Sequence, residues 1–185
     1  INTAMSAQMG NYYQGGLAVQ SGDTVYYGFR DDRKADSGEC YGLIARKTDG
    51  STKTVFTSNR APDSLYLSED GAFYFLCWEK LLRYDPAADK LEEVYAAKGK
   101  IDSFQIYDGR LYVLENYSGD SNYSDQWRYR FGCVENGQFR SLMDGITFNQ
   151  VINMDRFHIF NNKAYFLFGD STEPSSSGSD YVFYN

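Results

Sequence analysis

Asp70-Gly71-Ala72-Phe73-Tyr74-Phe75 is one of four gapless copies of a short pattern that decides the fold. Each copy has two turn-forming residues, a variable residue, an apolar residue, a tyrosine, and another apolar or aromatic residue. The other three copies lie at residues 22–27, 108–113 and 161–166. Self-similarity at a recurring spacing indicates an array of small structural units.

An apolar segment precedes the turn in every copy, at residues 15–20, 64–68, 102–106 and 156–160. Asp-Gly and related pairs between two apolar runs are the strongest short-range signal for a β-hairpin, because both turn positions favour positive φ. We therefore expect four copies of one β-hairpin, all in the same register.

Two further strands are expected after each hairpin. The predicted third strands are residues 40–46, 80–84, 127–133 and 180–184, and the predicted fourth strands are residues 54–56, 92–95 and 138–142. Units of four antiparallel strands that recur about every 40–50 residues are typical of β-propeller blades. A β-sandwich is the main alternative, but a sandwich does not require the same hairpin four times.

The fold class predicted for residues 1–185 is therefore an all-β propeller domain or fragment. Its blades are expected at about 15–59, 61–98, 101–146 and 155–185, which makes three and a half to four blades. We expect a piece of a larger propeller; the alternative is that residues 1–14 supply the missing strand and close a small ring. An open arc leaves apolar blade faces uncovered, so self-association through the end blades is expected. The chain begins at Ile1 without a basic-then-apolar leader, which favours a mature or trimmed chain.

Composition agrees with a β-rich domain and excludes several classes of partner. Aromatic residues make up 17% of the 185 residues, with 17 Tyr and 13 Phe, and such residues favour strands. The net charge of −7, without a cluster of Lys and Arg, argues against nucleic acid and against an anionic membrane surface. No apolar run is long enough for membrane insertion. Cys40, Cys77 and Cys133 are widely spaced and form neither a zinc motif nor an evident disulfide framework.

Variation between the copies is concentrated in the connections from the second to the third strand. These connections are residues 30–39, 78–79, 116–126 and 169–179. Loops on a rigid scaffold commonly carry binding, and acidic groups beside aromatic rings suit a sugar, a peptide or an amine. The alternative is that they are solvated loops of turn-forming residues. The candidate ligand-binding residues are Asp31, Asp36, Trp78, Tyr117, Tyr123 and Trp127.

Signals for catalysis and for cofactors are scarce. The chain has one histidine, His158, whose predicted counterparts in the other copies are Val19, Leu67 and Gln105. We expect His158 to pack in its blade or to face the central channel. A Ser-His-Asp site would require this residue, and the chain has no Gly-x-Ser-x-Gly motif or phosphate-binding glycine loop. Residues 120–125 lack the glycine and the distal glutamate of a calcium loop. We expect no cofactor, no metal and no enzymatic activity.

Residues 10–53 resemble one module of certain bacterial propeller domains of unknown function, which are similar to the low-density-lipoprotein-receptor-type (YWTD-like) β-propeller. The likeness rests on the aromatic pair Tyr26-Tyr27 and on the later layout Arg46-Lys47-Thr48-Asp49-Gly50-Ser51. Only the tyrosine of the receptors' Tyr-Trp-Thr-Asp motif is kept, so their ligand chemistry is not carried over. The resemblance implies six blades in a complete domain, an extracellular or cell-envelope location and a non-catalytic role.

The function expected from the sequence is a binding or scaffold module. It would recognise a glycan, a peptide or a protein through the loop face of the propeller. The alternative is a propeller-type glycoside hydrolase or lyase that uses carboxylates of the central channel, since paired carboxylates can cleave glycosidic bonds.

Overall fold

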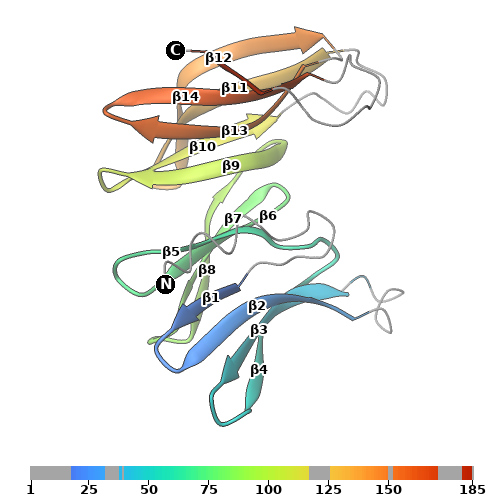
Figure 1. The fold of residues 1–185 in the computed structure, drawn as a ribbon, viewed down its shortest axis with the longest axis vertical. Coiled ribbons are helices and arrows are strands. Elements are labelled where there is room, and N and C mark those ends of the chain that lie inside the picture. The colour runs from blue at the N-terminus through green and yellow to red at the C-terminus, as the bar shows by residue number, and fades with distance from the viewer. Residues whose placement is uncertain are drawn as a thin grey trace. The chain divides into compact units, whose positions relative to one another are not determined.

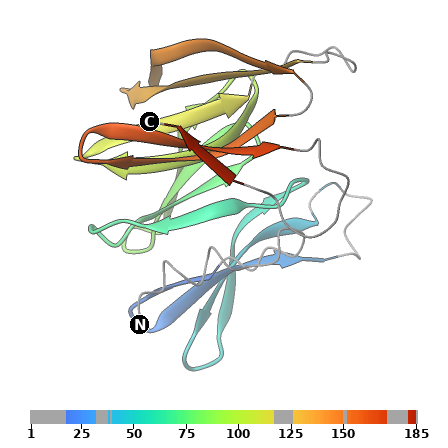
Figure 2. The ribbon, with the colours of Figure 1, turned by 45° about the horizontal axis from the view of Figure 1, so that its top comes forward.

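The chain consists of two compact units, Ile1–Val94 (unit 1) and Tyr95–Asn185 (unit 2). The computed structural model describes residues 18–31, 38, 40–116, 126–149, 152–170 and 181–184. Figures 1 and 2 show that the regular elements of this described part are antiparallel strands. None of the described residues belongs to a helix long and apolar enough to cross a membrane.

Unit 1 contains two four-stranded sheets, blade 1 and blade 2, in which the strands follow one another in chain order. The first strands of the two blades contact each other. Blade 1 consists of β1 (Ala18–Ser21), β2 (Thr24–Arg30), β3 (Tyr41–Lys47) and β4 (Thr52–Ser58). Blade 2 consists of β5 (Asp63–Leu67), β6 (Phe73–Cys77), β7 (Lys80–Asp85) and β8 (Lys90–Ala96), and the last two residues of β8 belong to unit 2.

Unit 2 repeats this plan with a four-stranded blade 3 and a three-stranded blade 4. The first strands of these blades also contact each other. Blade 3 consists of β9 (Lys100–Tyr107), β10 (Arg110–Asn116), β11 (Gln126–Glu135) and β12 (Gln138–Asn149). Blade 4 consists of β13 (Ile152–Phe160), β14 (Lys163–Asp170) and β15 (Tyr181–Tyr184). The predicted meanders of antiparallel strands are therefore confirmed.

The first hairpins of blades 3 and 4 have the turn geometry that the sequence predicts. Both turn residues have positive φ, at 49° and 68° in Asp108-Gly109 and at 49° and 59° in Asn161-Asn162. Two such residues match the right-handed twist of the strands that they join. In blade 1 only Gly22 of the turn has positive φ, at 60°. A two-residue turn therefore closes three of the four hairpins.

Blade 2 departs from the predicted common register. Its turn holds three residues, Glu69, Asp70 and Gly71, between Ser68 and Ala72, and the Ser68 amide donates to the Ala72 carbonyl over 2.8 Å. The additional residue shifts β5 by one position against β6. Tyr66 therefore pairs with the repeated tyrosine of β6, as Val19, Gln105 and His158 do in their blades, and the predicted counterpart Leu67 was wrong.

Aromatic side chains fill the interior of each unit. In unit 1 Phe73 lies between Tyr26 and Tyr84, with ring centroids 4.7 and 5.3 Å away, so the two blades are joined face to face. In unit 2 Phe131 of blade 3 contacts Phe157 of blade 4 at 4.9 Å in an edge-to-face arrangement. Such pairs add about 0.5–1.5 kcal/mol beyond the burial of their area. Aromatic side chains therefore form much of the packing between the blades of each unit.

Candidate functional site

The structure places only part of the predicted binding set. Trp78 and Asp31 are described in full; the Asp31 amide donates to the Cys40 carbonyl over 2.7 Å and closes the base of the β2–β3 connection. Trp127 lies on β11, where only its backbone is described. The remaining predicted residues, Asp36, Tyr117 and Tyr123, lie outside the described residues.

Three connections of unit 1 come together at the end of the blades where β2, β4 and β6 finish. A Cβ at Gly38 would lie 3.9 Å from the Cβ of Asn59, so the β2–β3 connection lies against the link between the blades. The next residue of this link, Arg60, contacts the β6–β7 turn through Trp78. We call Ser58, Asn59, Arg60, Cys77 and Trp78 the loop-end cluster.

Trp78 is the first residue of the two-residue turn between β6 and β7, and 45% of its surface is exposed. Its φ of 58° lies in the left-handed region, which is unusual for a bulky side chain. The preceding residues Leu76 and Cys77 are buried, so the chain passes from the core to the surface within one residue. Backbone conformations of this kind persist only where the surroundings hold them, and they concentrate at functional sites.

Arg60 is fixed on both sides of its backbone. Its amide donates to Ser58 Oγ over 3.1 Å, and its carbonyl accepts from Cys77 Sγ over 3.7 Å. The Arg60 guanidinium carbon then lies 4.4 Å from the centroid of the Trp78 ring, within the range of a cation–π interaction. The cation and the ring are thus arranged before any ligand arrives.

Cys77 is a structural thiol in this arrangement. Its sulfur lies 3.3 Å from Ser58 Oγ and the residue is buried. Burial raises the pKa of the Cys77 thiol, which favours the protonated form that donates to Arg60. Cys77 and Cys133 are both buried and free.

The sequence did not single out Arg60 or Ser58 as members of the site. Both lie at or near the link between blades 1 and 2, and this link is short and polar like any surface loop. The predicted topology gave one indication, because links between blades lie on the same propeller face as the connections from second to third strands. This topology indicates the face, but it does not indicate which residue of the link contacts Trp78.

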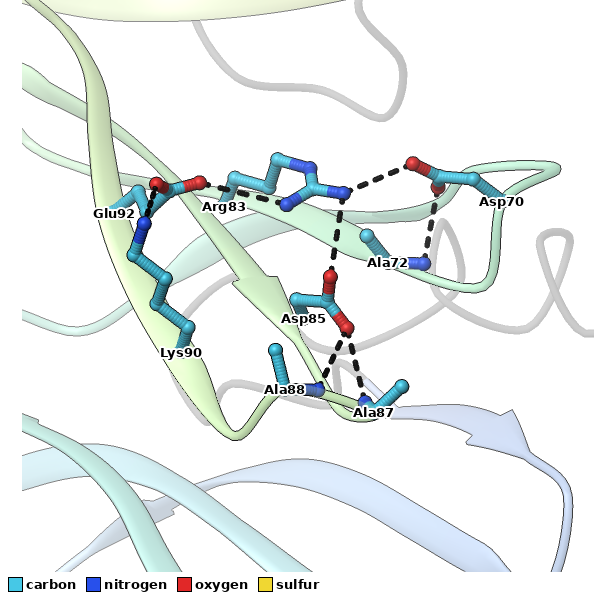
Figure 3. Close-up of polar contacts among 8 residues, drawn as sticks. All are labelled: Asp70, Ala72, Arg83, Asp85, Ala87, Ala88, Lys90 and Glu92. Carbon is cyan, nitrogen blue, oxygen red and sulfur yellow. Dashed lines mark hydrogen bonds and ion pairs between the residues drawn. The ribbon is translucent and has the colours of Figure 1, made fainter.

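A second polar group, on blade 2, gathers three carboxylates around one cation (Figure 3). Arg83 Nη2 lies 2.9 Å from Asp70 Oδ2 and 3.7 Å from Asp85 Oδ2, and Arg83 Nη1 lies 3.5 Å from Glu92 Oε2. Lys90 Nζ also lies 2.6 Å from Glu92 Oε1. These contacts join the β5–β6 turn to β7 and β8.

The electrostatics of this group do not suit acid catalysis. The hydrogen bond from Arg83, followed by that from the Ala72 amide, lowers the pKa of Asp70. The hydrogen bond from Lys90 lowers the pKa of Glu92. A general acid at neutral pH requires a raised pKa instead. We therefore interpret the Arg83 group as a structural clamp.

A buried carboxylate in blade 3 is also fully engaged. Glu115 has no exposed surface and accepts hydrogen bonds from Tyr95 and from Arg130. At the predicted equivalent positions, Phe29, Cys77 and Phe168, the other blades carry apolar or thiol side chains. Glu115 therefore substitutes a hydrogen-bonded group for an apolar core residue.

His158 does not pack within its blade. Its side chain is exposed, whereas those of Phe157 and Ile159 on either side are buried. Alternation along β13 places His158 on the opposite face from these core residues. Among the described residues no group of three or more His, Cys, Asp or Glu side chains could hold a metal ion. Residues 120–125, the remote calcium-loop candidate, lie outside the described part.

Comparison with known proteins identifies the fold but not a family. No protein-family model matches the chain, and no curated protein matches its sequence. The structure is similar to the N-terminal domain of Nup159, with a TM-score of 0.56 and 13% identity over 92% of this chain and 44% of that one. A chain in an S. cerevisiae assembly of Dbp5 bound to Nup159, Gle1, IP6 and ADP has a TM-score of 0.55 at 14% identity, with the same coverage.

TolB from Acinetobacter baumannii is similar with a TM-score of 0.50 and 18% identity, over 89% of this chain and 40% of that one. The chain thus spans less than half the length of these three structures. At these identities the likeness concerns the fold alone. Together with the antiparallel sheets described above, it shows that the chain has the β-propeller fold, with blades of four antiparallel strands.

Proposed function

We propose that this protein is a non-catalytic binding module that recognises a peptide or protein partner through the loop-end cluster. The observation that carries the proposal is the exposed Trp78 ring, held at the surface by a left-handed backbone and contacted on its ring by Arg60. Trp and Arg are enriched among the residues that contribute most of the free energy of protein interfaces. Ser58 and Cys77 already fix the Arg60 backbone, so ordering this backbone adds no further cost on binding.

A peptide or protein is favoured over a glycan because the cluster combines an aromatic ring with a cation. One chain of similar fold occurs in an assembly described as Dbp5 bound to Nup159, which is consistent with use of this fold for protein binding. The narrower likeness to bacterial YWTD-like propellers, and the extracellular or cell-envelope location that it implies, belong to the same proposal. Their support is the sequence layout of blade 1.

The proposal is tested by screening the protein against a displayed random-peptide library and a glycan array in parallel. Peptides that bind are then measured against Trp78→Ala and Arg60→Ala, with Phe160→Ala as the matched control. Phe160 is an aromatic residue with 58% exposure that belongs to unit 2 and not to the loop-end cluster. Circular dichroism confirms that each variant is folded.

We expect the two cluster variants to lose at least ten-fold in affinity for selected peptides and the control to bind as the wild type does. Peptides that bind all variants equally would contradict the proposal, as would the absence of any selected peptide. Glycan binding that depends on Trp78, without peptide binding, would show that the ligand class is wrong.

A further inference from the structure

A cavity of about 330 Å³ lies in unit 1 at the opposite end of the strands from the loop-end cluster. It lies between the starts of β2 and β4 and the end of β3 in blade 1, and the β7–β8 turn of blade 2. We call it the turn-end cavity, and its chemistry comes mainly from Thr24, Tyr26, Lys47, Lys53, Tyr84 and Asp89. Its volume is at the lower end of the range of about 300–1,000 Å³ for small-molecule sites.

The wall formed by blade 2 is held in place by hydrogen bonds. Tyr84 Oη donates to Asp89 Oδ1 over 2.6 Å, and Lys53 of blade 1 forms an ion pair with the other oxygen of the same carboxylate. Hydrogen bonds from Lys53, first, and from Tyr84 lower the pKa of Asp89, so this carboxyl group is ionised at neutral pH. The charge of Lys53 is thus largely balanced within the protein.

Lys47 differs from Lys53 in this respect. Among the described residues no carboxylate lies within salt-bridge distance of Lys47 Nζ, although Asp49 is near enough to interact with it through space. Within the described part of the chain, the Lys47 ammonium therefore has no paired carboxylate. This ammonium would attract an anionic ligand.

The remaining polar lining consists of hydroxyl groups. Thr24 and Tyr26 are buried neighbours in the cavity lining. Thr24 Oγ1 donates to Asp23 Oδ1 over 2.8 Å and also hydrogen-bonds Tyr26, so it can only accept from a ligand hydroxyl. Ser51 adds a hydroxyl to the lining and hydrogen-bonds Asp49. Hydroxyl groups both donate and accept, so they match a ligand that carries hydroxyl groups of its own. The tyrosine rings themselves are buried in the core and leave little ring face for stacking.

We propose that the turn-end cavity binds a small hydroxyl-bearing carboxylate of the uronic-acid class. The ligand carboxylate pairs with Lys47, and the ligand hydroxyls bond to Thr24, Tyr26 and Ser51. The ionised carboxylate of Asp89 in the same lining repels a second negative charge, which favours a monoanion over a phosphate dianion. This site is independent of the loop-end cluster, because the two lie at opposite ends of the same strands.

The test is a titration of the whole chain, followed by NMR, with three probes: D-glucuronate, D-glucose and inorganic phosphate. We expect glucuronate to bind at least ten-fold more tightly than glucose and more tightly than phosphate. Lys47→Ala should weaken glucuronate binding at least five-fold. The matched control Lys98→Ala removes an exposed lysine of unit 2 and should leave binding unchanged.

Asp89→Asn is a second variant, and it should strengthen glucuronate binding, whereas Lys47→Ala should weaken it. Asn tolerates the φ of 51° at this position, and its amide oxygen still accepts from Tyr84. The substitution releases Lys53 from its carboxylate, so glucuronate should bind several-fold more tightly while glucose is unaffected.

Equal binding of glucose and glucuronate, tighter binding of phosphate, binding of none of the probes, or indifference to Lys47→Ala would each overturn the proposal. Trp78→Ala should not affect this titration. The result is therefore separable from the peptide-binding experiment on the loop-end cluster.

Discussion

The Nε atom of Arg130 lies 2.5 Å from Oε2 of Glu115, and the two residues face each other in register across β10 and β11. Glu115 is fully buried and Arg130 is partly buried, with 21% of its side chain exposed. The Arg130 guanidinium also covers the Phe139 ring at 4.4 Å. The other carboxylate oxygen accepts from Tyr95, whose ring stacks on that of Phe139. Glu115, Arg130 and Phe139 of blade 3 therefore form a closed group with Tyr95 of β8, in which every member contacts two others.

Removing one charge of this group should destabilise unit 2 strongly. Arg130→Met leaves the Glu115 carboxylate buried without its counter-charge, and breaking a buried ion pair in this way costs about 3–5 kcal/mol. We expect a loss of this size in the free energy of unfolding, measured by urea denaturation monitored by tryptophan fluorescence.

The double variant Glu115→Leu with Arg130→Met is the control for this prediction. Replacing a buried pair with apolar residues of similar size is often neutral or stabilising. The double variant should therefore recover most of the stability lost in Arg130→Met. A loss below about 1 kcal/mol in the single variant would contradict the interpretation of Glu115 as a buried ion.

The Arg83 clamp predicts a dependence of stability on acid. The pKa of Asp70 is lowered in the folded protein, so its contribution is fully present above the unfolded value of about 3.9 and is lost as the pH falls through the folded value. More than half of the Asp70 side chain is exposed, so solvent screening keeps this contribution small.

Denaturation midpoints measured between pH 6 and pH 3 check this prediction. Arg83→Gln should flatten the decline below pH 4 relative to the wild type. Arg110→Gln, which removes an exposed arginine of β10, should leave the decline unchanged. The clamp would be refuted by parallel declines in the wild type and in Arg83→Gln.

The repeated hairpins were predictable because their signal is local. Asp108-Gly109 and Asn161-Asn162 supply residues that accept positive φ between two apolar runs, and nothing distant is needed to form such a turn. The shifted register of blade 2 was not predictable from the tyrosine alignment. The turn of blade 2 holds the additional residue Glu69, and β5 is irregular against β6 between Asp63 and Tyr66, which only the strand pairing reveals.

The two candidate sites depend on contacts between residues far apart in the sequence. Arg60 reaches Trp78 across a link and a hairpin, and Lys53 reaches Asp89 from a different blade. Trp78 became a candidate because it lies in one of the variable connections from second to third strand. Lys47, Lys53 and Asp89 did not become candidates because lysine and aspartate next to turns are common on any surface. Local patterns thus predicted the scaffold, and Trp78 stays a predicted binding residue.

Two glycines of third strands should not tolerate a side chain. A Cβ at Gly42 would lie 2.0 Å from the Phe56 carbonyl oxygen, and a Cβ at Gly132 would lie 2.3 Å from that of Arg140. Both glycines lie beside register shifts, where the neighbouring strand approaches closely. Gly42→Ala and Gly132→Ala should each lower the free energy of unfolding by about 1–3 kcal/mol, as overpacked interiors do.

Gly109→Asn is the control for these glycine variants. Its φ of 68° is acceptable to asparagine, and no atom lies within 4 Å of the added Cβ. This variant should unfold within about 0.5 kcal/mol of the wild type, as unremarkable surface substitutions do. Wild-type stability in Gly42→Ala and Gly132→Ala would show that the strands separate readily at these shifts.

At most positions alanine gives a more stable protein than glycine, but the left-handed backbone of Trp78 should reverse this order. A φ of 58° costs an L-residue about 1–2 kcal/mol, whereas glycine adopts it freely and loses about 0.5–1 kcal/mol through its greater chain entropy. Trp78→Gly should therefore be more stable than Trp78→Ala by roughly 0.5–1 kcal/mol, the difference of these two estimates. Both variants lose the same contact with Arg60, so the difference between their stabilities reports the effect of the backbone conformation alone.

The same pair of substitutions at Val25, an exposed position of β2 without positive φ, should give the opposite order of stability. If alanine is the more stable residue at both positions, Trp78 is not held in the left-handed region, and the preorganisation of the loop-end cluster loses its physical basis.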